Sequence, residues 1–159
     1  MRSAPALART AATLSPTRWA AIVRATVWIL ATRLALWVLP WRRVSKWFEA
    51  RGPRPGPPDM ARARIDRWAV HAVTRRILRG RPCLTQALVA RRFLRRHGVE
   101  TELRLGALLD GSQFRAHAWL ERDGHVVIGG VESTQAYTSF RPIQSGPPSP
   151  PMEEDEWAE

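Results

Sequence analysis

The chain of 159 residues contains a single cysteine, Cys83, which opens a predicted helix directly after Pro82. A thiol is a useful nucleophile only as the thiolate, and the first turn of a helix stabilises that anion through free N–H groups and partial positive charge. The same N–H groups can bind the oxyanion that forms during acyl transfer. Cys83 is therefore the candidate nucleophile, although a lone cysteine in a helix is more often a packed small side chain.

The candidate base is His117, which lies in the middle of a predicted strand in the run RAHAWLE. The alternation of a strand places it on one face with Trp119 and Glu121. An imidazole that faces the start of the cysteine helix can accept the thiol proton and later protonate a leaving amine. Either residue alone could be a structural side chain without a catalytic role. The combination of a cysteine at a helix start with a histidine on a facing strand is what indicates catalysis. The other histidines occupy positions typical of solvated or structural side chains: His71, His97 and His125.

The amino-acid composition excludes several classes of protein and of metal site for this chain. A hydrophobic content of 45% with eight tryptophans predicts a packed core and excludes a wholly disordered chain. One cysteine excludes an internal disulfide framework and a multi-cysteine zinc or iron–sulfur site. Because no phosphate-binding loop is present either, we expect no metal ion and no cofactor.

Helices are predicted first along the chain. Ser15 and Pro16 make a helix start, and Pro40 marks its end. After a Pro/Gly-rich stretch, Asp59 caps an amphipathic helix over 60–79, and a second helix runs from Cys83 to a glycine stop at position 98.

From residue 101 onward apolar and polar residues alternate, which predicts strands from 101, over 113–121 and over 125–129. An Asp-Gly hairpin turn joins the last two. Helices followed by an antiparallel meander indicate an α+β domain. The expected organisation has five parts: a flexible N-terminus at 1–14, a tryptophan-rich helical part at 15–51, a linker at 52–58, the core at 59–140, and a disordered Pro-rich and acidic tail at 141–159.

The apolar stretch 19–40 has the length of a membrane span, but Arg24 and Arg33 interrupt it. An arginine near a bilayer centre costs roughly 2.5–3.5 kcal/mol on insertion scales, which argues against spanning. The stretch also lacks the cleavage site of a secretory signal. We expect a helix that packs on the core, with contact to a membrane surface or to a partner as the alternative, in a cytoplasmic protein.

The net charge is +11, and 24 of the 25 basic residues are arginine. This charge motivates a second hypothesis, a non-enzymatic protein that binds nucleic acid or anionic lipid. No helix-turn-helix, RNA-recognition or zinc-finger pattern is present, so we expect no nucleic-acid partner.

The run CLTQALVARRFLRRHGVETELRLGALL, followed by FRAHAWLERDGHVVIGG, resembles the lasso-peptide maturation peptidases, a family of transglutaminase-like, papain-related cysteine peptidases. The shared elements are Cys-Leu at 83–84 opening a helix, Gly98 ending it, a strand with Gly106, and His-Ala-Trp at 117–119 before the hairpin. The tryptophan-rich helix before the linker also resembles the family, and the resemblance covers roughly residues 15–140.

This resemblance implies a transglutaminase-like fold over 59–140 and a leader peptidase as the activity, with Cys83 as nucleophile and His117 as general base and acid. Its partners would be a ribosomally made precursor peptide, a separate leader-recognition protein and a macrolactam synthetase. The chain has no obvious segment left for leader recognition, so it resembles the stand-alone peptidase form.

The family places an acidic residue on the following strand to orient the imidazole, whereas this chain has glycines there. If the hairpin pairs Glu121 with Val126, then Gly130 lies opposite His117, and Glu132 is a diagonal neighbour at ~7–8 Å. Glu132 is thus the candidate third member, with a backbone carbonyl or a water as the alternative. A third functional hypothesis keeps this fold and transfers the acyl group to an amine, as transglutaminases do, because both reactions share the thioester step.

Overall fold

A computed structural model describes residues 15–49, 56–78, 82–110, 112–130 and 137–140. In this part of the chain the helices are α2 (Pro16–Val38), α3 (Trp41–Glu49), α4 (Met60–Ile77) and α5 (Cys83–Arg96). The strands that follow are β1 (Glu102–Asp110), β2 (Gln113–Arg122), β3 (His125–Ile128) and β4 (Thr138–Ser139). Helices before an antiparallel sheet confirm the α+β fold class. The expected flexible N-terminus and disordered tail lie outside the described residues, as does Glu132.

The ends of the helices follow from capping and from proline. The Ser15 hydroxyl accepts a hydrogen bond from the Arg18 N–H at 3.4 Å, as predicted for the start of α2. The Asp59 carboxylate caps α4 in the same way, accepting from the Arg62 N–H at 3.1 Å. Pro40 ends α2 as predicted, because the residue before a proline avoids the helical region. The tryptophan-rich part therefore contains two helices, α2 and α3, with a break between them.

The four strands are antiparallel in the order β3-β2-β1-β4. The predicted hairpin is confirmed, with Asp123 and Gly124 at φ values of 51° and 82° in the turn, and Glu121 pairs with Val126 as expected. A bulge between Leu120 and Glu121 then shifts the register by one residue. The expectation that Gly130 lies opposite His117 is wrong, because this shift and the end of β3 at Ile128 remove that pairing.

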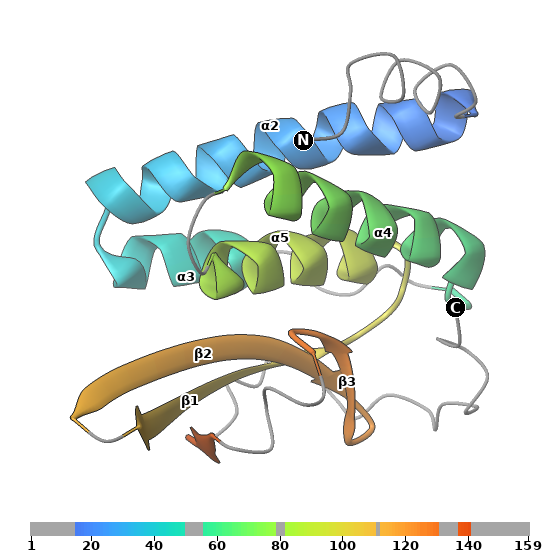
Figure 1. The fold of residues 1–159 in the computed structure, drawn as a ribbon. Coiled ribbons are helices and arrows are strands. Elements are labelled where there is room, and N and C mark those ends of the chain that lie inside the picture. The colour runs from blue at the N-terminus through green and yellow to red at the C-terminus, as the bar shows by residue number, and fades with distance from the viewer. Residues whose placement is uncertain (1–14, 50–55, 79–81, 111, 131–136, 141–159) are drawn as a thin grey trace, which may run out of the picture.

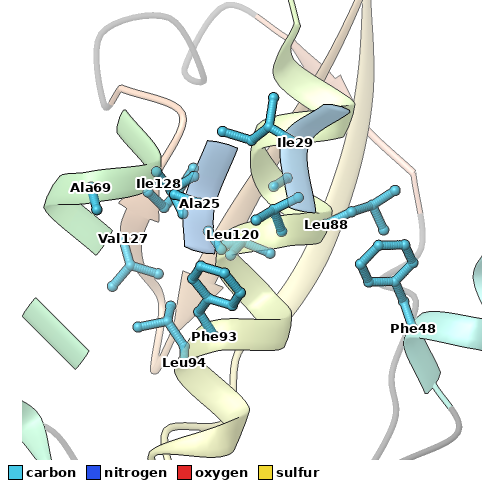
Figure 2. Packing of buried hydrophobic residues seen from close by; sticks show 14 of the residues in the cluster. Ala25, Ile29, Phe48, Ala69, Leu88, Phe93, Leu94, Leu120, Val127 and Ile128 are labelled. Carbon is cyan, nitrogen blue, oxygen red and sulfur yellow. The ribbon is translucent and has the colours of Figure 1, made fainter. Parts of the chain in front are cut away.

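The helices form a layer on one side of the sheet, with α5 next to the strands and α2 on the far side (Figure 1). Figure 2 shows the core between these layers, where side chains from α2, α4, α5, β2 and β3 meet in one cluster. Phe93 and Leu88 of α5 and Leu120 of β2 are among its largest buried side chains. The helix that carries Cys83 is therefore held from both sides.

A buried cluster of charges explains the arginine in the middle of α2. The carboxylate of Asp66 in α4 is 1% exposed and forms an ion pair with Arg24. Its other oxygen lies 2.9 Å from Nε2 of His97, at the end of α5. Among the described residues α2 is the one helix that is long and apolar enough to cross a membrane. In this structure, however, its Arg24 lies in a contact that ties α2 to α4 and α5.

Candidate active site

Cys83 is the first residue of α5, as predicted, and follows Pro82. Its side chain is half-buried between the start of the helix and β2. The N–H groups of Leu84, in the same helical turn, and of Ala118, on β2, both donate hydrogen bonds to the sulfur. Two backbone donors on one sulfur favour the thiolate over the thiol, because only the anion is a strong acceptor.

His117 lies on β2 opposite Gly106 of β1, and its ring forms a hydrogen bond with the Cys83 thiol. The ring Nε2 lies 3.1 Å from the carbonyl oxygen of Gly129. Because a carbonyl can only accept, Nε2 carries the proton in this contact and Nδ1 is left as the nitrogen that can accept one. The structure thus brings together the two predicted residues, with the imidazole in the tautomer that a general base requires.

The surroundings of the sulfur act on its pKa in opposite directions. Burial raises the pKa of the Cys83 thiol, whereas the His117 hydrogen bond, the Ala118 N–H, the charge of His117 and the Leu84 N–H all lower it. The contributions that lower the pKa are together larger than the effect of burial, so the pKa of the Cys83 thiol lies below its ordinary value. A half-buried cysteine with a lowered pKa beside an imidazole is the environment of a reactive thiol rather than of a packed one.

The model of the transglutaminase-like superfamily matches residues 26–143. The chain belongs to this superfamily. Its members are typically cysteine-dependent enzymes, and they include cysteine peptidases and transglutaminases. Comparisons with curated proteins and with solved structures gave no significant match.

In this transglutaminase-like domain the imidazole rests on Trp119, two residues along β2. The two rings are stacked, with centroids 5.9 Å apart and planes at 21°. The indole is 2% exposed, and its Nε1 donates to Glu121 at 2.6 Å, while the other oxygen of that carboxylate accepts from Arg104 at 2.8 Å. The predicted shared face of His117, Trp119 and Glu121 is confirmed. The contacts of Glu121 hold the indole in place, and the imidazole stacks on that indole.

Two glycines make room for this indole. A Cβ at Gly106 would lie 2.8 Å from Cη2 of Trp119, and a Cβ at Gly129 would lie 2.5 Å from the tryptophan Cβ. Gly129 also has a φ of 122°, which side chains rarely adopt. In the sequence this glycine lies where the family has an acid, and a backbone carbonyl was the alternative to Glu132. The contact of the Gly129 carbonyl with Nε2 of His117 agrees with that alternative.

Tyr137 is a second neighbour of the imidazole that the sequence did not indicate. Its ring centroid lies 5.3 Å from that of His117, with the planes at 37°. The residue directly precedes β4, which pairs with β1 through Gly106 and Ala107. The last strand predicted from the sequence is 125–129, and β4 was not predicted because a strand of two residues leaves no periodicity to detect.

The third predicted member, Glu132, lies outside the described residues, so its role stays a prediction. The other histidines have structural contacts: His97 with Asp66, His125 with the carbonyl of Asp123 at 3.1 Å, and His71 with Gln86 at 3.1 Å. Across the described ranges, no group of three or more His, Cys, Asp or Glu side chains is placed to hold a metal ion.

Proposed function

We propose that this chain is a cysteine peptidase that removes the leader from a lasso-peptide precursor. The observation that carries the proposal is the hydrogen-bonded pair of Cys83 and His117 at the start of α5, in a member of the transglutaminase-like superfamily. The leader substrate is supported by the ordered motifs that resemble the lasso-peptide maturation peptidases, namely Cys-Leu at 83–84 and His-Ala-Trp at 117–119 ahead of the hairpin.

In the first half of the reaction, the Cys83 thiolate attacks the carbonyl carbon at the junction of leader and core. The N–H groups of a helix's first turn have no partner within the helix, so the Cys83 N–H is available to bind the resulting oxyanion. Collapse of this intermediate breaks the peptide C–N bond, and the His117 imidazolium gives its Nδ1 proton to the leaving amine. The core peptide departs with a new amino terminus, and the leader remains on Cys83 as a thioester.

In the second half, neutral His117 accepts a proton from a water molecule, whose oxygen attacks the thioester carbonyl. The C–S bond breaks, the leader leaves as a carboxylic acid, and the sulfur returns to the thiolate beside the protonated imidazole. We propose that a separate leader-recognition protein presents the precursor in the cytoplasm. A macrolactam synthetase would then consume the freed amine.

The test is a cleavage assay with the full chain, a lasso-peptide precursor and its recognition protein, followed by mass spectrometry. We expect two products whose masses sum to the precursor plus one water, and no cleavage by Cys83→Ala or His117→Ala. The matched control is His125→Ala, since His125 is exposed and contacts only a turn carbonyl among the contacts described for it. Cleavage retained by either site variant, in protein that melts like the parent, would refute the assignment.

Acyl transfer to an amine is the second candidate, because the superfamily includes transglutaminases and the thioester is common to both reactions. The same assay separates the two when a primary amine is added. A leader product that carries the mass of the amine minus one water, in place of the free acid, would favour the transferase.

A further inference from the structure

Helix α2 presents a continuous apolar stripe on the side away from the rest of the protein. Large hydrophobic side chains recur on it at alternating intervals of four and three residues, and all are exposed: Val23, Val27, Leu30, Leu34 and Trp37. The opposite face of α2, which includes Ala25 and Ile29, is buried against the core. At the end of the helix Trp37 is 86% exposed, and Val38, Leu39 and Trp41 extend the exposed surface into the corner between α2 and α3. We call this surface the α2 stripe.

Exposed basic residues adjoin members of the α2 stripe along the chain. Arg33 precedes Leu34 on α2, Arg42 and Arg43 directly follow Trp41 at the α2–α3 corner, and Lys46 lies further along α3. The sequence has no acidic residue before Glu49, and within the described part of the chain none of these four cations takes part in an ion pair. The α2 stripe is therefore apolar along α2 and has exposed cations next to Leu34 and next to Trp41 at its corner.

We propose that the α2 stripe lies on an anionic lipid surface, with the axis of α2 parallel to the membrane plane. Monomeric proteins rarely expose large contiguous apolar patches, and large hydrophobic side chains are exposed along the whole length of this stripe. An apolar face bordered by arginines is typical of helices that rest at the boundary between headgroups and acyl chains. Tryptophan favours the same depth, and Trp37 and Trp41 both lie at the α2–α3 corner. At ~1.5 Å per residue α2 is about 34 Å long, which gives an extended contact.

The charges favour lipid over a second copy of the chain. Two copies that met through their α2 stripes would bring like charges together, and such juxtapositions disfavour association. Anionic headgroups complement the same charges, and long arginine side chains reach them while their stems stay in the apolar layer. Spanning is disfavoured, because it would remove Arg24 from its buried contact with Asp66.

The proposed orientation leaves the cysteine–histidine pair accessible. The sheet that carries His117 lies on the opposite side of the helical layer from α2 (Figure 1). A protein resting on its α2 stripe would therefore hold the sheet away from the membrane. The lipid contact does not depend on the proposed peptidase activity and can be tested without it.

The test is flotation of the purified full chain with two kinds of vesicle, phosphatidylcholine alone and phosphatidylcholine mixed with phosphatidylglycerol. We expect binding to the mixed vesicles that weakens as salt is added. The double variant Leu34→Ser with Trp37→Ser should bind roughly tenfold more weakly or worse, because it removes two anchors from the apolar layer. The double variant Arg42→Ser with Arg43→Ser should lose roughly fivefold in affinity for each charge, and only on anionic vesicles.

The matched control is Phe114→Ser, since Phe114 is 71% exposed at the far end of the β1–β2 hairpin. This variant should float like the parent, and all variants should melt like the parent because the altered side chains are exposed. Absence of flotation on mixed vesicles would overturn the proposal. So would equal losses in the Phe114 and stripe variants, or a parent dimer in sedimentation that the stripe variant converts to monomer.

Discussion

The contact between Gly129 and His117 can be tested by adding a single methyl group. In Gly129→Ala the new Cβ would lie 2.5 Å from the Cβ of Trp119, whereas ordinary contacts are 3.4–4 Å. The chain must move by about 1 Å to relieve this overlap, and overpacking of this kind costs about 1–3 kcal/mol. The backbone adds a further ~1–3 kcal/mol, because φ is 122° at this residue. We therefore expect a loss of about 2–6 kcal/mol in the free energy of unfolding.

The same displacement should carry the Gly129 carbonyl away from Nε2 of His117, which lies 3.1 Å from it in the parent. An imidazole that loses this acceptor is free to rotate and to hold its proton on the other nitrogen. The Cys83 thiol then loses its proton acceptor, and its pKa should rise. The measurement is the rate of alkylation of Cys83 by iodoacetamide as a function of pH, which follows the thiolate fraction.

Gly124→Ala is the matched control. Gly124 also has a positive φ, 82°, but a Cβ there would meet nothing within 4 Å. This variant should lose only the backbone contribution, about 1–2 kcal/mol, and should leave the alkylation profile of Cys83 unchanged. If Gly129→Ala and Gly124→Ala lose equal stability and alkylate alike, then the Gly129 carbonyl does not position His117.

Two further variants test the effect of His117 on the Cys83 thiol and the effect of the buried Asp66 carboxylate on stability. His117→Leu removes both the hydrogen bond and the charge that lower the pKa of Cys83, while burial still raises it. Alkylation of this variant should therefore require a higher pH than that of the parent, and an unshifted profile would show that His117 does not act on the thiol. Asp66→Asn leaves Arg24 and His97 without their buried anion, so the free energy of unfolding should fall by about 3 kcal/mol in denaturant titration. A loss within experimental error would mean that the ion cluster does not hold α2 in place.

The lowered pKa of Cys83 also sets a direction for stability against pH. A group that ionises to an anion, and whose pKa is lower in the folded state, stabilises the fold above its unfolded pKa. This contribution is lost as the pH falls through the folded-state pKa. Comparison of the parent with Cys83→Ala should therefore show a stability difference that grows in favour of the parent as the pH rises toward the ordinary thiol range. A constant difference would mean that the thiol titrates alike in the folded and unfolded chain.

The positions of Cys83 and His117 could be predicted because both depend on local signals. A proline before an apolar helical pattern predicts that the helix begins at Cys83, and strand alternation places His117 with Trp119. The α+β class follows in the same way from the order of the two periodicities. These inferences need no knowledge of how the elements pack against one another.

The bulge in the β2–β3 hairpin could not be predicted, because it depends on packing. Val127 and Ile128 are consecutive, yet both are buried in the core, which strict alternation forbids. The bulge at Leu120 and Glu121 resolves this conflict by changing the register. It is therefore the core, rather than the sequence near the histidine, that decides which residue of the β3 end meets His117. The contact of Arg24 with Asp66 was missed for the same reason, since the two residues lie 42 positions apart.

The candidate third catalytic group from the sequence was the Glu132 carboxylate, with a backbone carbonyl as the alternative, and the polar contacts described for Cys83 and His117 beyond their own pair come from the backbone. The Leu84 and Ala118 N–H groups stabilise the negative charge on the sulfur, and the Gly129 carbonyl stabilises a proton on the imidazole. A carbonyl dipole attracts an imidazolium less than a full negative charge does, so a carboxylate in its place would stabilise the protonated imidazole more strongly. Every residue carries the same backbone groups, so residue types rarely show which of these groups act in a site. Gly129 is the exception in this site, because only a residue without a Cβ brings its carbonyl this close to His117 beside the Trp119 indole.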